Sequence, residues 1–377
     1  MHYLTNKTFR IALATKNGAY FLSPDEARKN WKLGGPILPG ENLNKIIEDG
    51  NGNLFAASFD EGIFKSTDGG RTWKQSSKGL IVRKVWELAA KPNQKGTVYA
   101  GTQYGHLFRS TNYGENWEEV TSLHEAPNRR EWGIDWGYRT TGLALHTIRF
   151  DVNRPDMIYL VAAGNGTYRS DDGGETWKSI KAGTDRSCNI EPEKLISSAP
   201  PDASPEEKLA RHLEELHSDT HKIVVSQKDG KIFQQNHCGT FFSSNNGDLW
   251  KDISIDRTNR FGFSIDVIEN DSTHVFTIPV PDVENDCRAH NVCIRGQLAI
   301  YSTSDYGKIW KRHTNGLPDN VHTNVLRDSI AHDNTKDPGL YFGTTTGDVY
   351  FSGDLGNSWR SIASGIGRIQ GLNVIEP

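Results

Sequence analysis

Three histidines of this chain stand in similar apolar surroundings. His146 lies in "LHTIRF", His221 in "THKIVV" and His237 in "QQNHCG". Aligning the apolar residues of the first two segments places both histidines at the start of a strand-like run. Neutral imidazoles are good ligands for Zn, Fe or Cu, and three of them leave positions open for water or substrate. If the fold brings these side chains together, they predict a site for one transition metal ion.

A hydrogen-bonding role for the same histidines is also compatible with the sequence, because a buried imidazole can bond to its neighbours and to ordered water. Three further strand starts align with them and would surround the same place. They supply Trp86 in "KVWELAA", Phe263 in "FGFSID" and Asp328 in "LRDSIA". We expect Trp86 and Phe263 to contact a ligand there, and Asp328 to take part in catalysis.

A second candidate site lies in the stretch "SLHEAPNRREWGIDWGYRTTG", which starts at Ser122. Aromatic faces beside carboxylates suit the stacking and hydrogen bonding of sugars. A glycosidase works with a pair of carboxylates, and Glu131 or Asp135 with Asp328 could form that pair. The alternative, that the rings only pin a long loop to the fold, stays open. The candidate residues of this stretch are Glu131, Trp132, Asp135, Trp136 and Tyr138.

A repeated turn must position these residues. The pattern S-x-D-x-G-x-x-W, as in "STDGGRTW" from Ser66, recurs with small variations, and an eroded copy, "SPDEARKNW", starts at Ser23. Its Asp or Asn can accept hydrogen bonds from the amides of its own turn, its Gly supplies a positive φ, and its Trp is expected to pack back onto the hairpin. The Asp or Asn of the six clear copies are Asp68, Asn112, Asp172, Asn245, Asp305 and Asp354.

Strand-like apolar runs precede each copy of the turn, for example "TVYAGT" and "GHLFRS" before Asn112. Copies at intervals of about 40 to 75 residues are typical of four-stranded propeller blades with insertions. We therefore predict an all-β fold, a single seven-bladed β-propeller over residues 1–377. The C-terminal "RIQGLNVIEP" is expected to join the first blade as its innermost strand and to close the ring.

The repeated turn resembles the Asp box of the BNR repeat, which occurs in sialidases and in sortilin-type receptors. Segments such as "QQNHCGTFFSSNNG" and "NVLRDSIAHD" are similar to the WD40/YVTN/BNR-like group, whose members are labelled exo-alpha-sialidase-like. The resemblance implies the propeller fold and carries no reaction with it. Sialidases have an Arg-Ile-Pro signature, whereas here Arg10 is followed by Ile11 and Ala12. Sialidase activity is therefore not expected.

Three insertions interrupt the repeat, at residues 121–140, 181–220 and 279–296. The strand count places all three on the face opposite the repeated turns, where we expect a ligand to bind. The second insertion carries "SPEEKLARHLEEL" from Ser204, which predicts one short amphipathic helix. The third contains "CRAHNVC", and three ligands are one short of a closed zinc site. We expect Cys287 and Cys293 to form a disulfide or to remain thiols.

Charge argues against one class of partner. Lys and Arg number 43 against 47 Asp and Glu, a formal net charge of -4, and the basic residues are scattered. Nucleic acid is not an expected partner, because binding its phosphates requires a basic surface. We find no signal-peptide pattern and no apolar run long enough to cross a bilayer, so we expect a cytoplasmic protein without a membrane partner.

Three functions from different classes fit this sequence. The first is a small-ligand-binding propeller that holds Fe, Cu or Zn through His146, His221 and His237 and performs hydrolytic or oxidative chemistry. The second is a glycosidase or glycan-binding propeller that uses the aromatic stretch without metal. The third is a scaffold that binds a peptide or protein in the manner of sortilin-type propellers.

Overall fold

The middle strands of the repeats are apolar on both faces. β5 (Leu54–Ser58) and β9 (Val98–Thr102) are buried along their whole length. A strand needs apolar side chains on both faces when other layers cover both of them, as happens between the packed sheets of neighbouring blades. The sequence therefore builds sheets that are stable only when stacked on one another.

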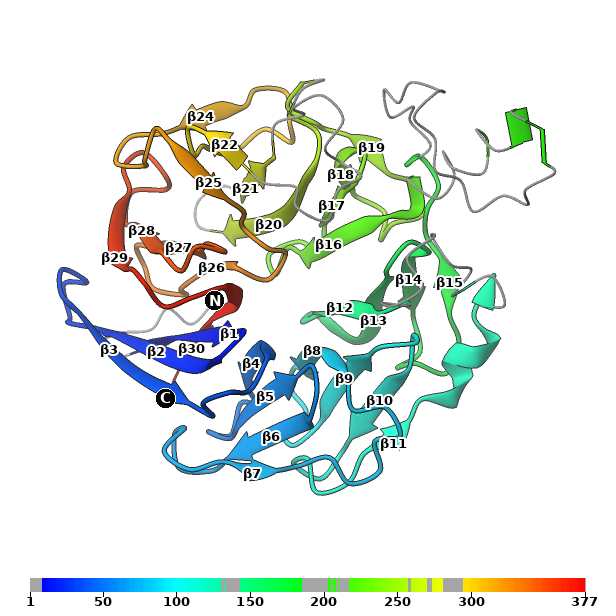
Figure 1. Cartoon of the computed structure of the whole chain (residues 1–377). Coiled ribbons are helices and arrows are strands. Elements are labelled where there is room, and N and C mark those ends of the chain that lie inside the picture. The colour runs from blue at the N-terminus through cyan, green and yellow to red at the C-terminus, as the bar shows by residue number, and fades with distance from the viewer. Residues whose placement is uncertain are drawn as a thin grey trace.

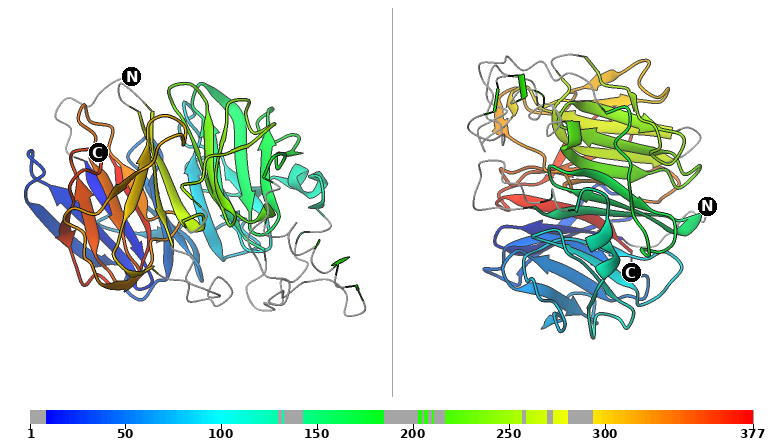
Figure 2. Two further views of the ribbon diagram at one scale, coloured as in Figure 1. Left: turned by 90° about the horizontal axis from the view of Figure 1, so that it is seen from above. Right: turned by 90° about the vertical axis from the view of Figure 1, so that its right-hand side faces the viewer.

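The computed structural model describes residues 9–129, 132, 143–184, 203–204, 206–207, 210, 217–256, 259–269, 273–280 and 294–376. In this part of the chain seven four-stranded antiparallel sheets stand around a central axis (Figure 1). Side views show the sheets packed face to face around the ring (Figure 2). The predicted all-β, seven-bladed propeller is confirmed.

Each blade runs from an innermost strand at the channel to an outermost strand at the rim. Blade 1 contains β30 (Ile369–Ile375), β1 (Arg10–Thr15), β2 (Gly18–Pro24) and β3 (Trp31–Ile37). Blades 2 to 4 contain β4 (Leu43–Glu48), β5, β6 (Gly62–Ser66) and β7 (Lys74–Gln75); β8 (Val85–Ala90), β9, β10 (Leu107–Ser110) and β11 (Glu118–Glu119); and β12 (Leu145–Asp151), β13 (Arg154–Ala162), β14 (Gly166–Ser170) and β15 (Lys178–Ser179). Blades 5 to 7 contain β16 (Thr220–Val225), β17 (Ile232–Asn236), β18 (Gly239–Ser243) and β19 (Lys251–Asp252); β20 (Gly262–Glu269), β21 (Thr273–Pro279), β23 (Ile300–Thr303) and β24 (Lys311–His313); and β26 (Ile330–His332), β27 (Leu340–Gly343), β28 (Val349–Ser352) and β29 (Arg360–Ala363).

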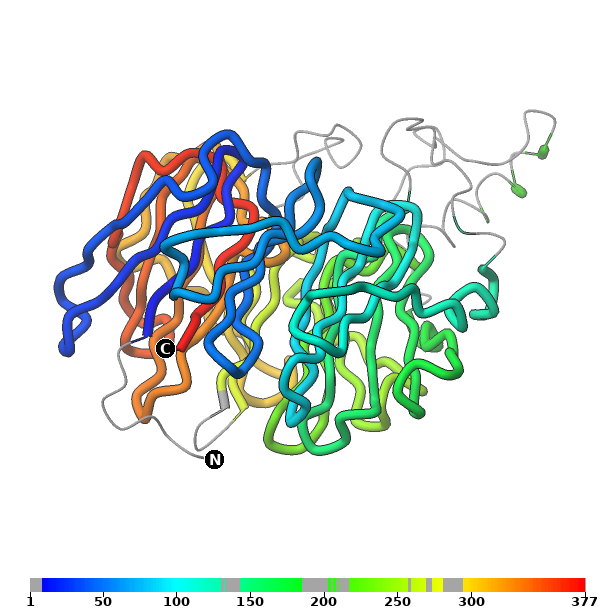
Figure 3. Tube along the Cα trace, turned by 90° about the horizontal axis from the view of Figure 1, so that it is seen from below, coloured from blue at the N-terminus to red at the C-terminus, as the bar shows by residue number. Residues whose placement is uncertain are grey.

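The two ends of the described chain meet in blade 1. β30 pairs antiparallel with β1, from Arg10 opposite Ile375 to Ala14 opposite Gly371. In the trace the red C-terminal strand runs beside the blue N-terminal strands (Figure 3). This pairing covers an edge of β1 that would otherwise be free. It makes β30 the innermost strand of blade 1 and joins the last part of the chain to the first, which closes the ring.

The repeated turn is held by its own side chains, as the copy after β14 shows. The Ser170 hydroxyl donates to Asp172 Oδ1 at 2.7 Å and accepts the amide of Gly174 at 2.8 Å. Asp172 Oδ1 also accepts the amides of Glu175 and Thr176. These bonds satisfy amides that no strand partner reaches.

The Gly of the turn lies against the preceding blade. Gly114 adopts a φ of +79°, and a Cβ atom there would lie 2.5 Å from the Phe55 ring of blade 2. Both the backbone conformation and the close approach of the two blades therefore require glycine.

The Trp of the turn has two kinds of partner. In two copies the indole Nε1 donates within its own turn, as the sequence suggests: Trp73 to the carbonyl of Gly70 and Trp359 to that of Gly356. In three copies the indole Nε1 donates to a backbone carbonyl of the preceding blade: Trp117 to Ser76, Trp250 to Ile180 and Trp310 to Ile253, at 2.7 to 2.8 Å. These carbonyls come within reach only when consecutive blades pack together, so the sequence of a single repeat does not predict the contact. The motif therefore links one blade to the next by a hydrogen bond, in addition to stabilising its own hairpin.

A short helix and a two-stranded sheet lie outside the blades in the described part of the chain. The 3-10 helix η1 (Thr121–Glu125) follows β11, and β22 (Ile294–Gly296) pairs with β25 (Val321–Thr323). Most of the helix predicted from Ser204 lies outside the described residues. Its start is described: the Glu207 amide donates to Ser204 Oγ, and the Ser204 amide donates to Glu207 Oε2. This reciprocal pair is a helix-capping arrangement.

Candidate functional site

A β-bulge near the start of the innermost strand recurs in five consecutive blades. In blade 5, Thr220 lies opposite Asn236 and Lys222 opposite Gln235, so His221 is an extra residue with no partner in the ladder. Bulges turn side chains away from the regular alternation and are common next to active sites. The extra residues of blades 2 to 6 are Asn44, Trp86, His146, His221 and Phe263.

This ring of bulges lies at the blade edge opposite the repeated turns, as expected from the strand count. Asp328 precedes Ile330, the first residue of β26, and makes a bridge with Gly371 of blade 1. It therefore takes the corresponding place in blade 7. The sequence alignment of Trp86, His146, His221, Phe263 and Asp328 thus describes one mouth of the channel.

Two of the three predicted histidines meet at this mouth, and they meet around Asp219. The carboxylate Oδ2 of Asp219 lies 3.2 Å from His221 Nε2 and 3.4 Å from His237 Nδ1. The three possible ligand atoms all lie within 4.8 Å of one another. Burial opposes the ionisation of Asp219, but the contacts with His221 and His237 outweigh it and hold the pKa of Asp219 well below its usual value.

Backbone contacts fix the positions of these side chains. The His237 amide donates to the carbonyl of Asp219 at 2.8 Å, which joins the turn between β17 and β18 to the entry of β16. His221 Nδ1 lies 2.5 Å from the carbonyl oxygen of Gly262 on blade 6. Because a carbonyl only accepts hydrogen bonds, Nδ1 must carry the proton.

That tautomer creates an electrostatic problem inside the cluster. A neutral His221 with its proton on Nδ1 presents the lone pair of Nε2 to the carboxylate of Asp219. Two electron pairs then face each other across 3.2 Å. Either a second proton on the imidazole or a cation between the two groups removes the repulsion.

Two phenylalanines form an apolar wall beside the cluster. The Phe263 ring stacks on His221 with a centroid distance of 4.8 Å, and the Phe261 ring lies edge-on to His237 at the same distance. Phe263 thus occupies the predicted place at the mouth, where it contacts a histidine. Apolar walls lower the local dielectric constant and strengthen the interaction of any ion with the ligands.

His146 lies near the cluster but is not part of it. Its side chain is 3% exposed, and Nδ1 lies 3.3 Å from the hydroxyl of Thr147. Burial, and then the positive charge of Arg327, lower the pKa of His146 well below its usual value. His146 is therefore a neutral residue in the second layer around Asp219 and His221.

Arg327 is the unusual cation of the mouth. Its Nε is buried without a hydrogen-bond partner, and no hydrogen bond or ion pair of its guanidinium joins another residue in the described part of the chain. Burial lowers the pKa of Arg327, although the charges of Asp328 and Asp219 oppose the change. A guanidinium nitrogen that is buried without a hydrogen-bond partner is costly unless an anion completes it.

A network of ion pairs surrounds Asp328. Asp328 Oδ1 lies 3.0 Å from Lys45 Nζ, 3.2 Å from Arg149 Nη2 and 3.9 Å from Lys222 Nζ. Burial opposes the ionisation of Asp328, but these three cations keep its pKa far below the usual value. The carboxylate is saturated by protein cations and is poorly placed to act on a substrate.

Glu87 belongs to the same network and has no exposed surface. It lies 3.3 Å from Lys45 Nζ and 3.5 Å from Arg149 Nη1. Burial, and then the charge of Asp328, raise the pKa of Glu87 to about 7. Separated pKa values of two nearby carboxyl groups are typical of acid-base pairs, yet here both groups are enclosed by cations.

The remaining predicted ligand-binding residues fall into two groups. Trp86 is half-buried, with its Nε1 2.6 Å from Gln103 Oε1. Trp132 is 7% exposed, donates to the hydroxyl of Tyr168 at 2.8 Å and is covered by the guanidinium of Arg129. Glu131, Asp135, Trp136 and Tyr138 lie outside the described residues, as do Cys287 and Cys293.

Asp219 and Arg327 are the site residues that the sequence analysis missed. Asp219 stands two residues before His221, and alternate residues of an extended chain share a face, so the spacing was a usable signal. Arg327 directly precedes Asp328 and gave no such signal. Its significance comes from the buried Nε without a hydrogen-bond partner, which only the structure shows.

Cys238 follows His237 directly and is engaged in a disulfide. Its side chain is 2% exposed. The other cysteines of the chain lie outside the described residues. The covalent bond restrains the short turn that carries His237.

No protein-family model matches the chain. Among curated proteins, the xyloglucanase Xgh74A of Acetivibrio thermocellus is 32% identical over 134 residues, which covers 31% of this chain and 16% of that protein. A xyloglucanase from Paenibacillus sp is 33% identical over 138 residues, which covers 31% of this chain and 13% of that protein. The match takes in less than a fifth of the length of either relative.

Solved structures resemble the chain over most of its length. An ancestral GH74 enzyme superposes with a TM-score of 0.55 at 15% identity, over 88% of this chain and 38% of the other. YCF48 from Cyanidioschyzon merolae has a TM-score of 0.53 at 15% identity and covers 87% of both chains. YCF48 bound to D1 peptide has a TM-score of 0.51 at 11% identity, over 95% of this chain and 84% of the other. At these identities the likeness shows the fold alone, a seven-bladed β-propeller.

Among the helices of the described residues, none combines the length and the apolar character that crossing a membrane requires.

Proposed function

We propose that the mouth of this propeller binds one divalent transition metal ion through Asp219, His221 and His237. The carrying observation is the convergence of His221 Nε2 and His237 Nδ1 on one carboxylate oxygen of Asp219, at 3.2 and 3.4 Å. Ligand atoms that share one metal ion with bonds of about 2.1 Å lie roughly 3 to 3.5 Å apart, so the separations of 3.2 and 3.4 Å suit a shared ion.

Arg327 extends this proposal to the ligand. A guanidinium with free donors recognises carboxylate or phosphate groups, often through two hydrogen bonds. Two imidazoles and one carboxylate leave coordination positions open for water and for a substrate oxygen. The site therefore suits a small anionic substrate whose reacting group reaches the metal while its anionic group reaches Arg327.

The identity of the metal would decide the reaction. Zinc would lower the pKa of a bound water and support hydrolysis, whereas iron or copper would support oxidation. Lys222 and Lys45 add positive charge around Asp328 and would favour binding of an anion at the mouth as well.

Metal analysis tests this function. Untagged protein purified without chelators should contain metal, and His221→Gln or Asp219→Asn should lose one equivalent while keeping the circular dichroism spectrum. The matched control is His322→Gln, because His322 is exposed and lies on β25. Wild-type protein that takes up no more Zn²⁺, Fe²⁺ or Cu²⁺ than Asp219→Asn would show that a proton, and not a metal, separates His221 from Asp219.

The local match to two xyloglucanases favours a second function, binding or cleavage of a glycan such as xyloglucan. In this case the stretch around Trp136 would stack on sugar rings, and Glu131 or Asp135 would supply the acid. Asp328 is a weak partner for them, since three cations surround it. Binding of xyloglucan oligosaccharides that survives chelation and disappears in Trp136→Ala would select this function over the metal site.

The Cys238 disulfide bears on the compartment in which the protein works. Disulfides persist in oxidising compartments and are rare in the cytosol. We infer that the chain acts in an oxidising compartment rather than in the cytoplasm expected from the sequence. Thiol titration of protein isolated under alkylating conditions tests this point, and four free thiols would contradict it.

A further inference from the structure

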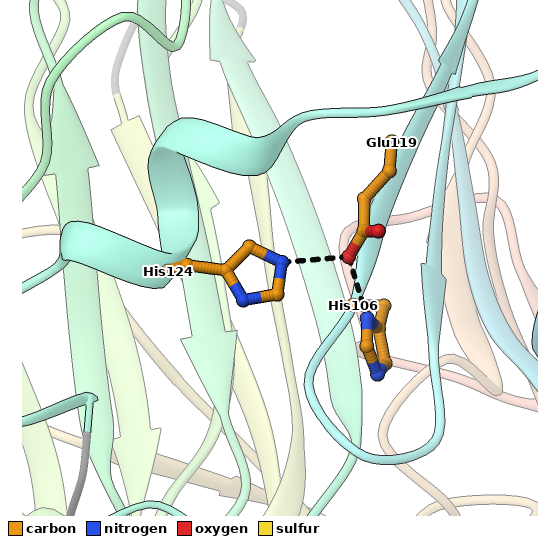
Figure 4. A group of neighbouring side chains, drawn as sticks. All are labelled: His106, Glu119 and His124. Atoms are coloured by element: carbon orange, nitrogen blue, oxygen red, sulfur yellow. Dashed lines mark hydrogen bonds and ion pairs between the residues drawn. The ribbon is translucent and has the colours of Figure 1, made fainter.

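A second group of metal-ligand side chains lies at the rim of blade 3, away from the channel. His106 is in the turn between β9 and β10, Glu119 is in the outermost strand β11, and His124 is in the 3-10 helix η1. Figure 4 shows the two imidazoles approaching the same carboxylate from different elements. None of the three belongs to the mouth described above.

The distances are short and the geometry converges on one oxygen atom. Glu119 Oε1 lies 2.6 Å from His106 Nδ1 and 2.8 Å from His124 Nε2. The two rings are 5.8 Å apart and inclined at 65°, so they point at the oxygen from two directions. The possible ligand atoms lie within 4.8 Å of one another.

The surroundings leave this group accessible to an ion from solvent. The side chains of His106, Glu119 and His124 are 20%, 19% and 43% exposed. Burial opposes the ionisation of Glu119, but hydrogen bonds from both histidines lower its pKa. The positive charge of Arg129 interacts with Glu119, and its guanidinium lies over the ring of Trp132.

We infer that His106, Glu119 and His124 form a second divalent-metal site, suited to Zn²⁺, that fastens η1 to blade 3. Two imidazoles and one carboxylate form a ligand set that Zn²⁺ accepts with water in the fourth position. Binding requires loss of the protons that now lie between nitrogen and oxygen, and a shift of the partly buried Glu119 carboxylate to bonds of about 2.1 Å.

The site would have a structural consequence because η1 is a link between two blades. Leu123 is 2% exposed and packs in the core shared with blade 4. The Ser122 hydroxyl donates to the carbonyl of Gly174, and the Trp177 indole lies 3.3 Å from the same hydroxyl. A metal ion at Glu119 would therefore add a tie between the rim of blade 3 and the turn of blade 4, at the start of the 121–140 insertion.

Zinc titration of the full-length, chelator-stripped protein against a chromophoric chelator tests the inference. His124→Gln and Glu119→Gln should each remove one equivalent or weaken it at least tenfold, and His322→Gln should not. Glu119→Gln is informative because the amide oxygen can still accept the histidine protons, so folding is kept while the charge is lost. Substitution with Co²⁺ should give visible absorption bands that disappear in the same two variants.

The outcome is separable from that at the mouth. A protein that binds Zn²⁺ in both places should lose one equivalent in His221→Gln, a different one in His124→Gln and both in the double variant. Loss in His124→Gln alone would support the rim site and contradict the mouth site. If His124→Gln and Glu119→Gln bind as much Zn²⁺ as wild type, with the same affinity, the group is a hydrogen-bonded triad and the inference fails.

Discussion

Lys45 of blade 2 and Asp328 of blade 7 form an ion pair across the position of blade 1, with Nζ and Oδ1 3.0 Å apart. Both side chains are about 6% exposed. The two blades are not neighbours in the ring, so their side chains can meet only in the channel. The pair therefore links the two sides of the seam that β30 closes.

Replacement of Lys45 should cost more stability than replacement of Lys222. Lys45→Met removes one of the two cations that Asp328 and Glu87 share and leaves them Arg149 alone, and breaking a buried ion pair costs about 3 to 5 kcal/mol. Lys222 lies 3.9 Å from Asp328, and burial lowers the pKa of Lys222 to about 8, so Lys222→Met should cost about 1 kcal/mol or less. Urea unfolding at pH 7 measures both. Equal losses would show that the network does not depend on the bridging lysine.

Replacement of Arg327 should stabilise the protein and weaken anion binding. Arg327→Met removes a partly buried guanidinium whose Nε has no hydrogen-bond partner, while Asp328 keeps Lys45 and Arg149. We expect the free energy of unfolding to rise by about 1 to 3 kcal/mol, the usual cost of an unsatisfied buried polar group. Thermal unfolding of wild type with added phosphate or citrate should shift upward, and the variant should not respond. A variant that is less stable than wild type would mean that Arg327 is already satisfied.

His146 should make the protein sensitive to mild acid. Its folded-state pKa lies well below the unfolded value, so the unfolded chain binds the proton more tightly. The corresponding stability is complete above about pH 6.5 and is lost as the pH falls toward the folded-state pKa, by up to about 1.4 kcal/mol per pH unit. The difference between wild type and His146→Gln in urea unfolding, with chelator present, should therefore narrow between pH 7 and pH 5. A constant difference across that range would exclude His146 as the source.

Ser170 should contribute more to stability than its size suggests. Ser170→Ala leaves the buried amide of Gly174 without its acceptor and removes a donor to Asp172. An unsatisfied buried amide costs about 1 to 3 kcal/mol. Ser179→Ala, in the neighbouring strand β15, is the control and should change stability by less than about 0.5 kcal/mol. Comparable effects of the two substitutions in denaturant titrations would contradict the role given to the turn.

The sequence by itself determined the number and kind of the blades. The repeated turn forms its hydrogen bonds between residues that are close in sequence, as Ser170, Asp172 and Gly174 show. Such local bonds can be predicted from the sequence alone. The equivalent positions of His146, His221 and Asp328 in their blades also followed from aligning the apolar residues, because the innermost strands repeat one pattern of burial.

Only the tertiary structure decided which of these residues meet. Blades 4, 5 and 7 contribute to one mouth, and the place of His146 outside the cluster of Asp219, His221 and His237 depends on how the ring arranges the bulges of the blades. The same is true of Trp117, which donates to the preceding blade, and of Asp328, which is surrounded by lysines and an arginine from three other blades. Contacts between residues far apart in sequence are set by closure of the ring, and no single repeat encodes them.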